Sequence, residues 1–172
     1  MLTSKVGAAL LFVLSLSLPG ASNVAQLQPG SLCERDEKIV FSCTLGKQAK
    51  PGKVVSLCSS KELTKEQGYL RYRFGVPGKI ELEYPKDGER PHEAFKYSHY
   101  FRAQVDETEI SFSLNGYEYS ISDDYNGEEK PVHHSQGITI TPPNNGKPVT
   151  LNCRERAKAQ YGDLADVFPA VE

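Results

Sequence analysis

The sequence predicts an all-β protein: a small antiparallel barrel or sandwich closed by two disulfides, with a short C-terminal helix. Apolar residues recur at every second position through a series of short segments, which is the pattern of strands with one buried face. Turn-forming residues such as Asn115-Gly116 separate these segments, and no long helical pattern intervenes. Closely spaced short strands of this kind are typical of antiparallel sandwiches and small barrels.

The first predicted strands lie at residues 39–44, 70–74 and 80–84, and residues 75–78 form the turn between the last two. The expected pairs in this hairpin are Phe74–Ile80, Tyr72–Leu82, Arg73–Glu81 and Arg71–Glu83. The two charged pairs are expected to lie on the solvent-facing side, where opposite charges across a strand pair are favourable.

The next predicted strands lie at residues 95–101, 110–114, 117–121, 138–140 and 149–151. Asn115-Gly116 fits a two-residue type I′ turn, which fixes the register of the strands on either side. The pairs expected on the core face are Leu114–Tyr117, Phe112–Tyr119 and Ile110–Ile121, and those on the other face are Ser113–Glu118 and Ser111–Ser120.

The β-rich core is expected to span about residues 33–153, and the tail at 154–172 is expected to be helical. Ala157, Tyr161 and Leu164 recur at helical spacing, and Gly162-Asp163 fits a stop followed by a new helix cap. Such a tail is expected to cover one open end of the sheet.

Residues 1–22 have the pattern of a signal peptide. Lys5 is followed by an apolar run from Val6 to Leu18 and then by small residues up to Ser22. The run is too short to span a membrane, and no second apolar run follows, so we expect no membrane insertion. The expected mature protein is one domain at residues 23–172, secreted or periplasmic. A formal net charge of −2 without a basic stripe argues against nucleic acid as a partner.

An even number of cysteines at wide spacing predicts two disulfides in an exported chain. Three pairings of Cys33, Cys43, Cys58 and Cys153 are conceivable. Cys43 and Cys153 fall on the core-facing positions of their strands, which favours Cys43–Cys153 together with Cys33–Cys58.

No metal, cofactor or catalytic residue is expected from the sequence motifs. The acidic stretch at 123–129 does not fit a helix-loop-helix calcium site, because Ser122 and His133 occupy the places of its first and last ligands. Zinc-type cysteine or histidine spacing and nucleophile motifs are also missing. An enzyme or metal-dependent binder that uses the Asp123–Glu129 turn with His133 and His134 remains an alternative.

Three features resemble the bacterial periplasmic inhibitors of c-type lysozyme: Phe41-Ser42-Cys43, Leu151-Asn152-Cys153, and a glycine-containing turn followed by tyrosine between them. The resemblance implies an eight-stranded antiparallel barrel and a Ser-Gly-x-x-Tyr loop that contacts the enzyme. The nearest match here is the stretch 113–117, in which glycine stands one residue before tyrosine instead of three. Stretches such as EKIVFSC also resemble exported proteobacterial proteins of uncharacterised activity.

The predicted function is therefore non-catalytic binding of a protein partner, with inhibition of a cationic, envelope-attacking hydrolase such as lysozyme as its most specific form. Tyrosine beside carboxylates suits a cationic partner. The candidate contact residues are Asn115, Gly116, Tyr117, Asp123, Asp124 and Tyr125. A structural envelope protein without a discrete ligand is a further alternative. A cleft that gathers histidines and carboxylates would favour catalysis, and a protruding tyrosine-rich loop would favour inhibition.

Overall fold

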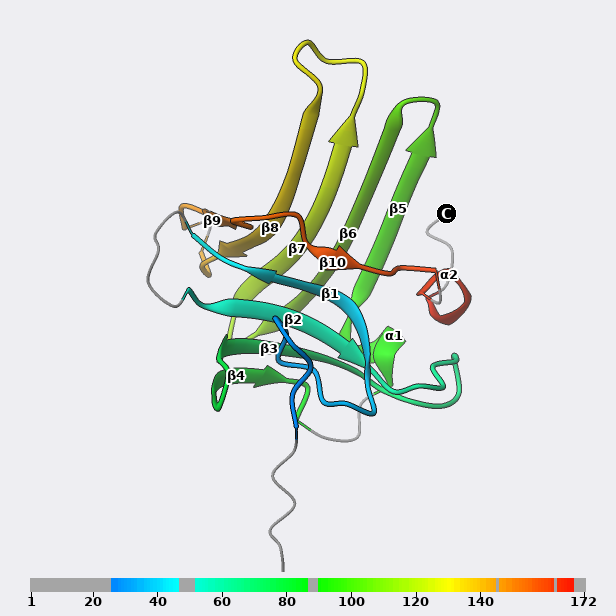
Figure 1. Ribbon diagram of the computed structural model, residues 1–172, viewed down its shortest axis with the longest axis vertical. Helices are drawn as coiled ribbons and strands as arrows, with labels where there is room; N and C mark the ends of the chain where they lie inside the picture. The colour runs from blue at the N-terminus through cyan, green and yellow to red at the C-terminus, as the bar shows by residue number, and fades with distance from the viewer. Residues whose placement is uncertain (1–25, 47–51, 87–89, 145, 163, 169–172) are drawn as a thin grey trace, which may run out of the picture.

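The computed structural model describes residues 26–46, 52–86, 90–144, 146–162 and 164–168, so the predicted signal peptide lies outside the described residues. Figure 1 shows the elements along the chain. They are β1 (Lys38–Thr44), β2 (Val54–Ser59), β3 (Leu70–Val76), β4 (Lys79–Tyr84), α1 (Pro91–Ala94), β5 (Lys96–Arg102), β6 (Val105–Leu114), β7 (Tyr117–Asn126), β8 (His133–Thr141), β9 (Val149–Asn152), β10 (Lys158–Ala159) and α2 (Leu164–Val167).

The strands form two antiparallel sheets that pack face to face as a sandwich, so the predicted all-β class is confirmed and the sandwich alternative is the correct one. The first sheet has the order β10-β1-β2-β3-β4 and the second the order β5-β6-β7-β8-β9. Strands of the two sheets cross steeply (Figure 1). The core between them contains Phe41, Leu57 and Tyr72 of the first sheet, and Ile110 and Ile121 of the second.

The hairpin between β6 and β7 has the predicted register throughout. Leu114 pairs with Tyr117 and Ile110 with Ile121. Asn115 and Gly116 have φ angles of 53° and 79°, the positive values that a type I′ turn requires at both central positions. The Asn-Gly pair therefore fixes which residues of both strands face the core.

The predicted register of the hairpin between β3 and β4 is wrong. Lys79 pairs with Val76 directly across Pro77-Gly78, and a bulge follows, so that Phe74 pairs with Leu82 and Arg73 with Glu83. The turn is thus shorter than predicted, and Gly75 permits the bulge: at its φ of +153°, a Cβ atom would lie 2.4 Å from the carbonyl oxygen of Lys79.

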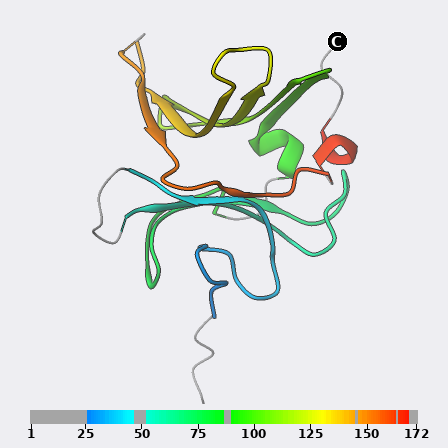
Figure 2. The same ribbon diagram turned by 45° about the horizontal axis from the view of Figure 1, so that its top comes forward.

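The outer face of the first sheet, predicted to be solvent-facing, is covered around Arg73, because residues 26–37 lie across it (Figure 2). Arg73 is only 1% exposed there. Its Nη1 lies 2.5 Å from Glu37 Oε2, and its Nε lies 2.8 Å from Glu83 Oε1. The disulfide Cys33–Cys58 attaches the covering segment to β2, as the predicted pairing requires.

The described part of the tail is largely extended, so the predicted helical tail at 154–172 is wrong apart from the short helix α2. After β9, the backbone N–H of Arg154 donates to the carbonyl oxygen of Thr44, and β10 then pairs with β1. The tail thus crosses from the second sheet to the edge of the first. The predicted disulfide Cys43–Cys153 is formed at this crossing, where the β1 end lies against the β9 end.

Candidate functional site

The inner face of the second sheet changes from apolar to polar along the strands. The register aligns side chains in rows across β5, β6, β7 and β8. The first row is Tyr97, Ile110, Ile121 and Ile138; the second is His99, Thr108, Asp123 and Gln136; the third is Phe101, Asp106, Tyr125 and His134. The ends of β5 to β8 that carry the polar rows extend past β10 (Figure 1). The first sheet covers the apolar rows, and the polar rows face a cleft.

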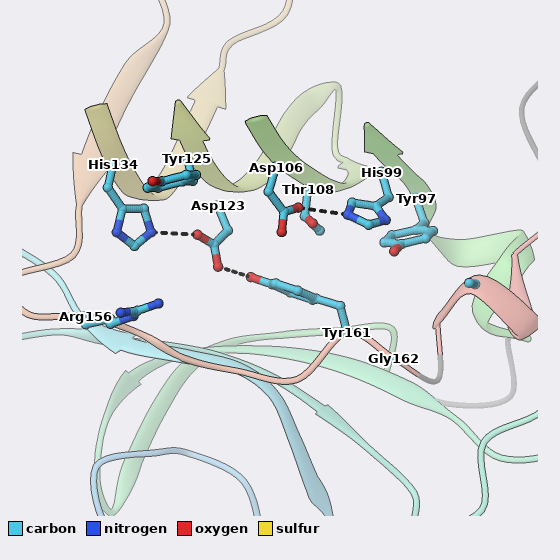
Figure 3. A pocket seen from close by; sticks show the side chains of 11 residues that line it. Tyr97, His99, Asp106, Thr108, Asp123, Tyr125, His134, Arg156, Tyr161 and Gly162 are labelled. Carbon is cyan, nitrogen blue, oxygen red and sulfur yellow. Dashed lines mark hydrogen bonds and ion pairs between the residues drawn. The ribbon is translucent and has the colours of Figure 1, made fainter. Parts of the chain in front are cut away.

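This cleft has a volume of about 650 Å³, which is within the usual range for small-molecule sites. One wall is the polar half of the second sheet. The other wall is the tail, which contributes Arg156, Tyr161, Gly162 and Ala165 (Figure 3). The departure of the tail from a helix is what places these residues opposite the sheet.

Asp123 is the centre of a hydrogen-bond network in the cleft. Its Oδ2 accepts from Gln136 Nε2 at 2.8 Å and from the Tyr161 hydroxyl at 3.1 Å, and its Oδ1 lies 3.1 Å from His134 Nε2. Gln136 in turn accepts from the backbone N–H of Ala157 at 2.8 Å, which ties the tail to the sheet. Burial, and then the Asp123 carboxylate, raise the pKa of Tyr161 far above its usual value, so its hydroxyl stays a donor.

An ionised carboxylate only accepts hydrogen bonds, so the His134 nitrogen that faces Asp123 is the protonated one. The other ring nitrogen, Nδ1, is then an acceptor in the neutral ring. No hydrogen bond to this Nδ1 is formed within the part of the chain that the structure describes. Asp123 therefore orients His134 so that one nitrogen is available to a ligand.

A second histidine–carboxylate pair lies on the opposite side of the cleft. His99 Nε2 is 2.8 Å from Asp106 Oδ1. The His99 ring also belongs to a row of rings along β5, with centroids 6.5 Å from Tyr97 and 6.3 Å from Phe101. Burial, and then Asp106, raise the pKa of Tyr97. Phe101 is 71% exposed, which core packing does not explain.

The structure divides the predicted contact residues between the two ends of β7. Asn115 and Gly116 form the turn before the strand and Tyr117 begins it. Tyr125 is eight residues after Tyr117, about 27 Å away at a rise of about 3.4 Å per residue. Asp123 and Tyr125 line the cleft. Asp124 alternates with them and faces the other side of the sheet. The six residues therefore do not form one surface.

His133 and His134 are likewise separated, because adjacent strand residues point to opposite faces and only His134 lines the cleft. No sequence motif indicates that His99, Asp106, Arg156 or Tyr161 is a functional residue. Asp106 could have been found from the predicted β6–β7 register. When this register is continued along both strands, it places Asp106 opposite Tyr125.

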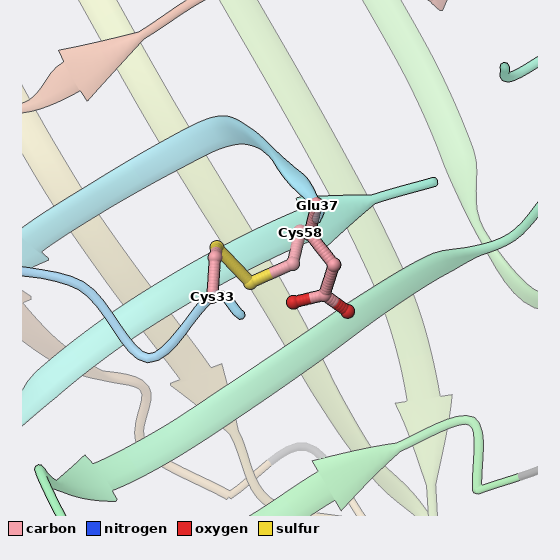
Figure 4. Close-up of side chains that lie close together, drawn as sticks. All are labelled: Cys33, Glu37 and Cys58. Carbon is pink, nitrogen blue, oxygen red and sulfur yellow. A yellow bond between two sulfur atoms is a disulfide. The ribbon is translucent and has the colours of Figure 1, made fainter. Parts of the chain in front are cut away.

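Cys33, Glu37 and Cys58 form the one group of three metal-ligating side chains that the described residues bring close together. Figure 4 shows that both sulfur atoms are joined in the disulfide. Thiolates are the metal-binding form of cysteine, so this group is structural.

No protein-family model, curated protein or solved structure matches the chain. The described helices are all too short to cross a membrane. Two disulfides are typical of proteins that fold in an oxidising compartment. Its function must therefore be inferred from the cleft.

Proposed function

We propose that the protein is exported and binds a small polar ligand in the cleft between the second sheet and the tail. The observation that carries the proposal is the network around Asp123, which holds polar side chains from β7, β8 and the tail in fixed positions. Binding sites need such preorganised polar groups beside aromatic surface. Tyr97 and Tyr125 supply that surface in the same cleft.

Export is supported by three features. The signal-like pattern at residues 1–22 predicts secretion to the periplasm or the medium. The two disulfides require an oxidising compartment. Cys33 and Cys58 are both fully buried, so the bond between them belongs to the folded core.

A fragment screen by NMR tests the binding proposal. Polar ring-containing compounds are added to the ¹⁵N-labelled mature protein, and amide shifts are mapped. We expect the shifts to cluster at His99, Asp106, Asp123, His134 and Tyr161. His134→Ala should weaken this binding, whereas the matched His133→Ala, on the other face of the strand, should not. Shifts confined to other surfaces would contradict the proposal.

Catalysis in the same cleft is the second candidate, and the His134–Asp123 pair is the observation that favours it. A histidine oriented by a carboxylate is the usual arrangement of a general base. If the cleft is catalytic, compounds that bind there should be converted over hours in the NMR tube. His134→Gln should stop conversion while binding persists; unchanged compounds would leave only the binding function.

Inhibition of lysozyme stays a prediction. The contact surface for lysozyme would be the Asn115-Gly116 turn with Tyr117, which is 41% exposed beside it. Lysozyme activity is titrated with the wild type, with Tyr117→Ala, and with Tyr125→Ala at the far end of β7. Loss of inhibition in Tyr117→Ala alone would support this function, and no inhibition by the wild type at micromolar concentration would eliminate it.

A further inference from the structure

We infer that the ligand of the cleft is a sugar that carries an anionic group, with the anion at Arg156 and the sugar ring on the aromatic row of β5. The inference rests on the proposed binding function and specifies the class of ligand. Three features of the cleft support it: the Arg156 guanidinium, the hydrogen-bonding groups of the histidines, and the row of rings on β5.

Arg156 is a positive charge that lines the cleft. Its side chain extends from the tail toward the Asp123–His134 pair (Figure 3). Within the residues that the structure describes, its guanidinium makes no hydrogen bond or ion pair. Both carboxylates of the cleft are already bonded to histidines. A guanidinium that has five donors and no partner suits a carboxylate or phosphate, which it binds through two parallel hydrogen bonds.

The remaining polar groups suit hydroxyls. Three donors already occupy the oxygens of Asp123, so this carboxylate has little capacity left to hold a cationic ligand. The free nitrogens of His99 and His134 accept hydrogen bonds when the rings are neutral and donate them when the rings are charged. Sugar hydroxyls both donate and accept, so they match histidine in either form.

The rings of Tyr97, His99 and Phe101 form a row on one face of β5. Their planes differ by 30° and 38° between neighbours, and the row is open to solvent at Phe101. Aromatic faces carry negative charge density and stack on the C–H faces of sugar rings. The sheet surface that lines the cleft extends over three strand spacings, about 14 Å, from β5 to His134 on β8. This width gives room for one or two sugar units.

Isothermal titration calorimetry with galacturonate, galactose 1-phosphate and galactose tests the inference, because these probes share a ring and differ in the anion. We expect at least one acidic sugar to bind about tenfold more tightly than galactose or better. Tighter binding of galacturonate would indicate a carboxylate ligand, and tighter binding of galactose 1-phosphate a phosphate ligand. Arg156→Gln should remove the preference, whereas Arg154→Gln, two residues away and outside the cleft, should keep it.

Phe101→Ala should weaken all the sugars that bind, without changing their order or the melting temperature, because Phe101 is largely exposed. Equal affinities, tighter binding of galactose, or a preference that survives Arg156→Gln would each overturn the inference. So would the absence of sugar binding when NMR fragments still bind in the cleft. That last result would leave the proposed binding function intact, so the two failures are distinguishable.

Discussion

At the residue scale, the least expected feature is a buried charge. Arg73 and Glu37 have side-chain exposures of 2% and 1%. Burial of ions is costly, and here the guanidinium also contacts Glu83 and donates to the carbonyl oxygen of Leu32. Glu37 accepts a further hydrogen bond from the Tyr69 hydroxyl, and burial followed by Glu37 raises the pKa of Tyr69 to about 12. The pair joins the N-terminal segment to the first sheet.

Glu37→Gln should therefore lower the free energy of unfolding by about 3 kcal/mol or more, because it leaves a buried guanidinium without its closest countercharge. Chemical denaturation of the purified variant measures the loss. Glu34→Gln is the matched control: Glu34 lies 3.8 Å from the same guanidinium but is 41% exposed, so its loss should cost less than about 1 kcal/mol. Equal effects of the two substitutions would contradict this account.

Asp124 shows the opposite situation, a carboxylate without a countercharge opposite it. It pairs with Glu107 across the strands. Burial, and then Glu107 and Asp123, raise its pKa above the ordinary 3.8. Because the folded state holds this proton more tightly than the unfolded state, the carboxyl group favours folding below pH 3.8, and that contribution is lost as the pH rises through the folded-state pKa.

Asp124→Asn should then raise the free energy of unfolding at pH 7 by about 0.5 kcal/mol, and the gain should vanish below pH 3.8. Denaturation midpoints at several pH values and low salt measure it. Glu118→Gln removes the same charge opposite Ser113 and should show no such gain. Destabilisation by Asp124→Asn at neutral pH would show that Asp124 makes a favourable contact instead.

At the element scale, the disulfides close loops of different length. The bond Cys43–Cys153 spans 110 residues and Cys33–Cys58 spans 25. By chain entropy alone, replacing the first pair by alanine should cost about 4.7 kcal/mol and replacing the second about 3.5 kcal/mol. Thermal and denaturant unfolding of the two double variants rank the losses. A larger loss for the Cys33–Cys58 pair would mean that its attachment of the covering segment outweighs loop entropy.

The two hairpins show which local signals determine register. Asn115-Gly116 admits one favoured turn geometry, so the pairing along β6 and β7 could be predicted. Between β3 and β4 the alternation of apolar residues fits several registers two residues apart, and the bulge between Phe74 and Gly75 shifts the pairing further. The helical part of the tail was predicted too long, because Ala157 and Tyr161 can also face inward from an extended chain held by β1, and only Leu164 lies in a helix.

At the scale of the whole molecule, strand alternation predicted an antiparallel barrel or sandwich and both disulfide pairings, but it did not predict the cleft. His99, Asp106, Asp123 and His134 occupy core-facing positions of four strands, and the sequence pattern grouped only Asp123 with His134. Extending the β6–β7 register past Ile110 aligns Asp106 with Tyr125. Tertiary packing decides where β5 and β8 lie in the sheet and where the tail crosses. The alternation of apolar residues carries no information on either.

Export is a prediction for the whole chain. The mature protein from a secreting host should begin between Ala21 and Gln26, and alkylation should find no free thiol, because all four cysteines are paired. Intact mass spectrometry before and after reduction measures both properties. Retention of residues 1–20, or alkylation without reduction, would contradict export to an oxidising compartment.

The most direct test of the central claim is a crystal structure of the mature protein soaked with the tightest-binding compound of the NMR screen. The account predicts that the compound lies in the cleft, with a polar atom about 3 Å from His134 Nδ1 or from the Arg156 guanidinium. A compound bound only at the Asn115-Gly116 turn, or only on the outer face of the second sheet, would contradict it.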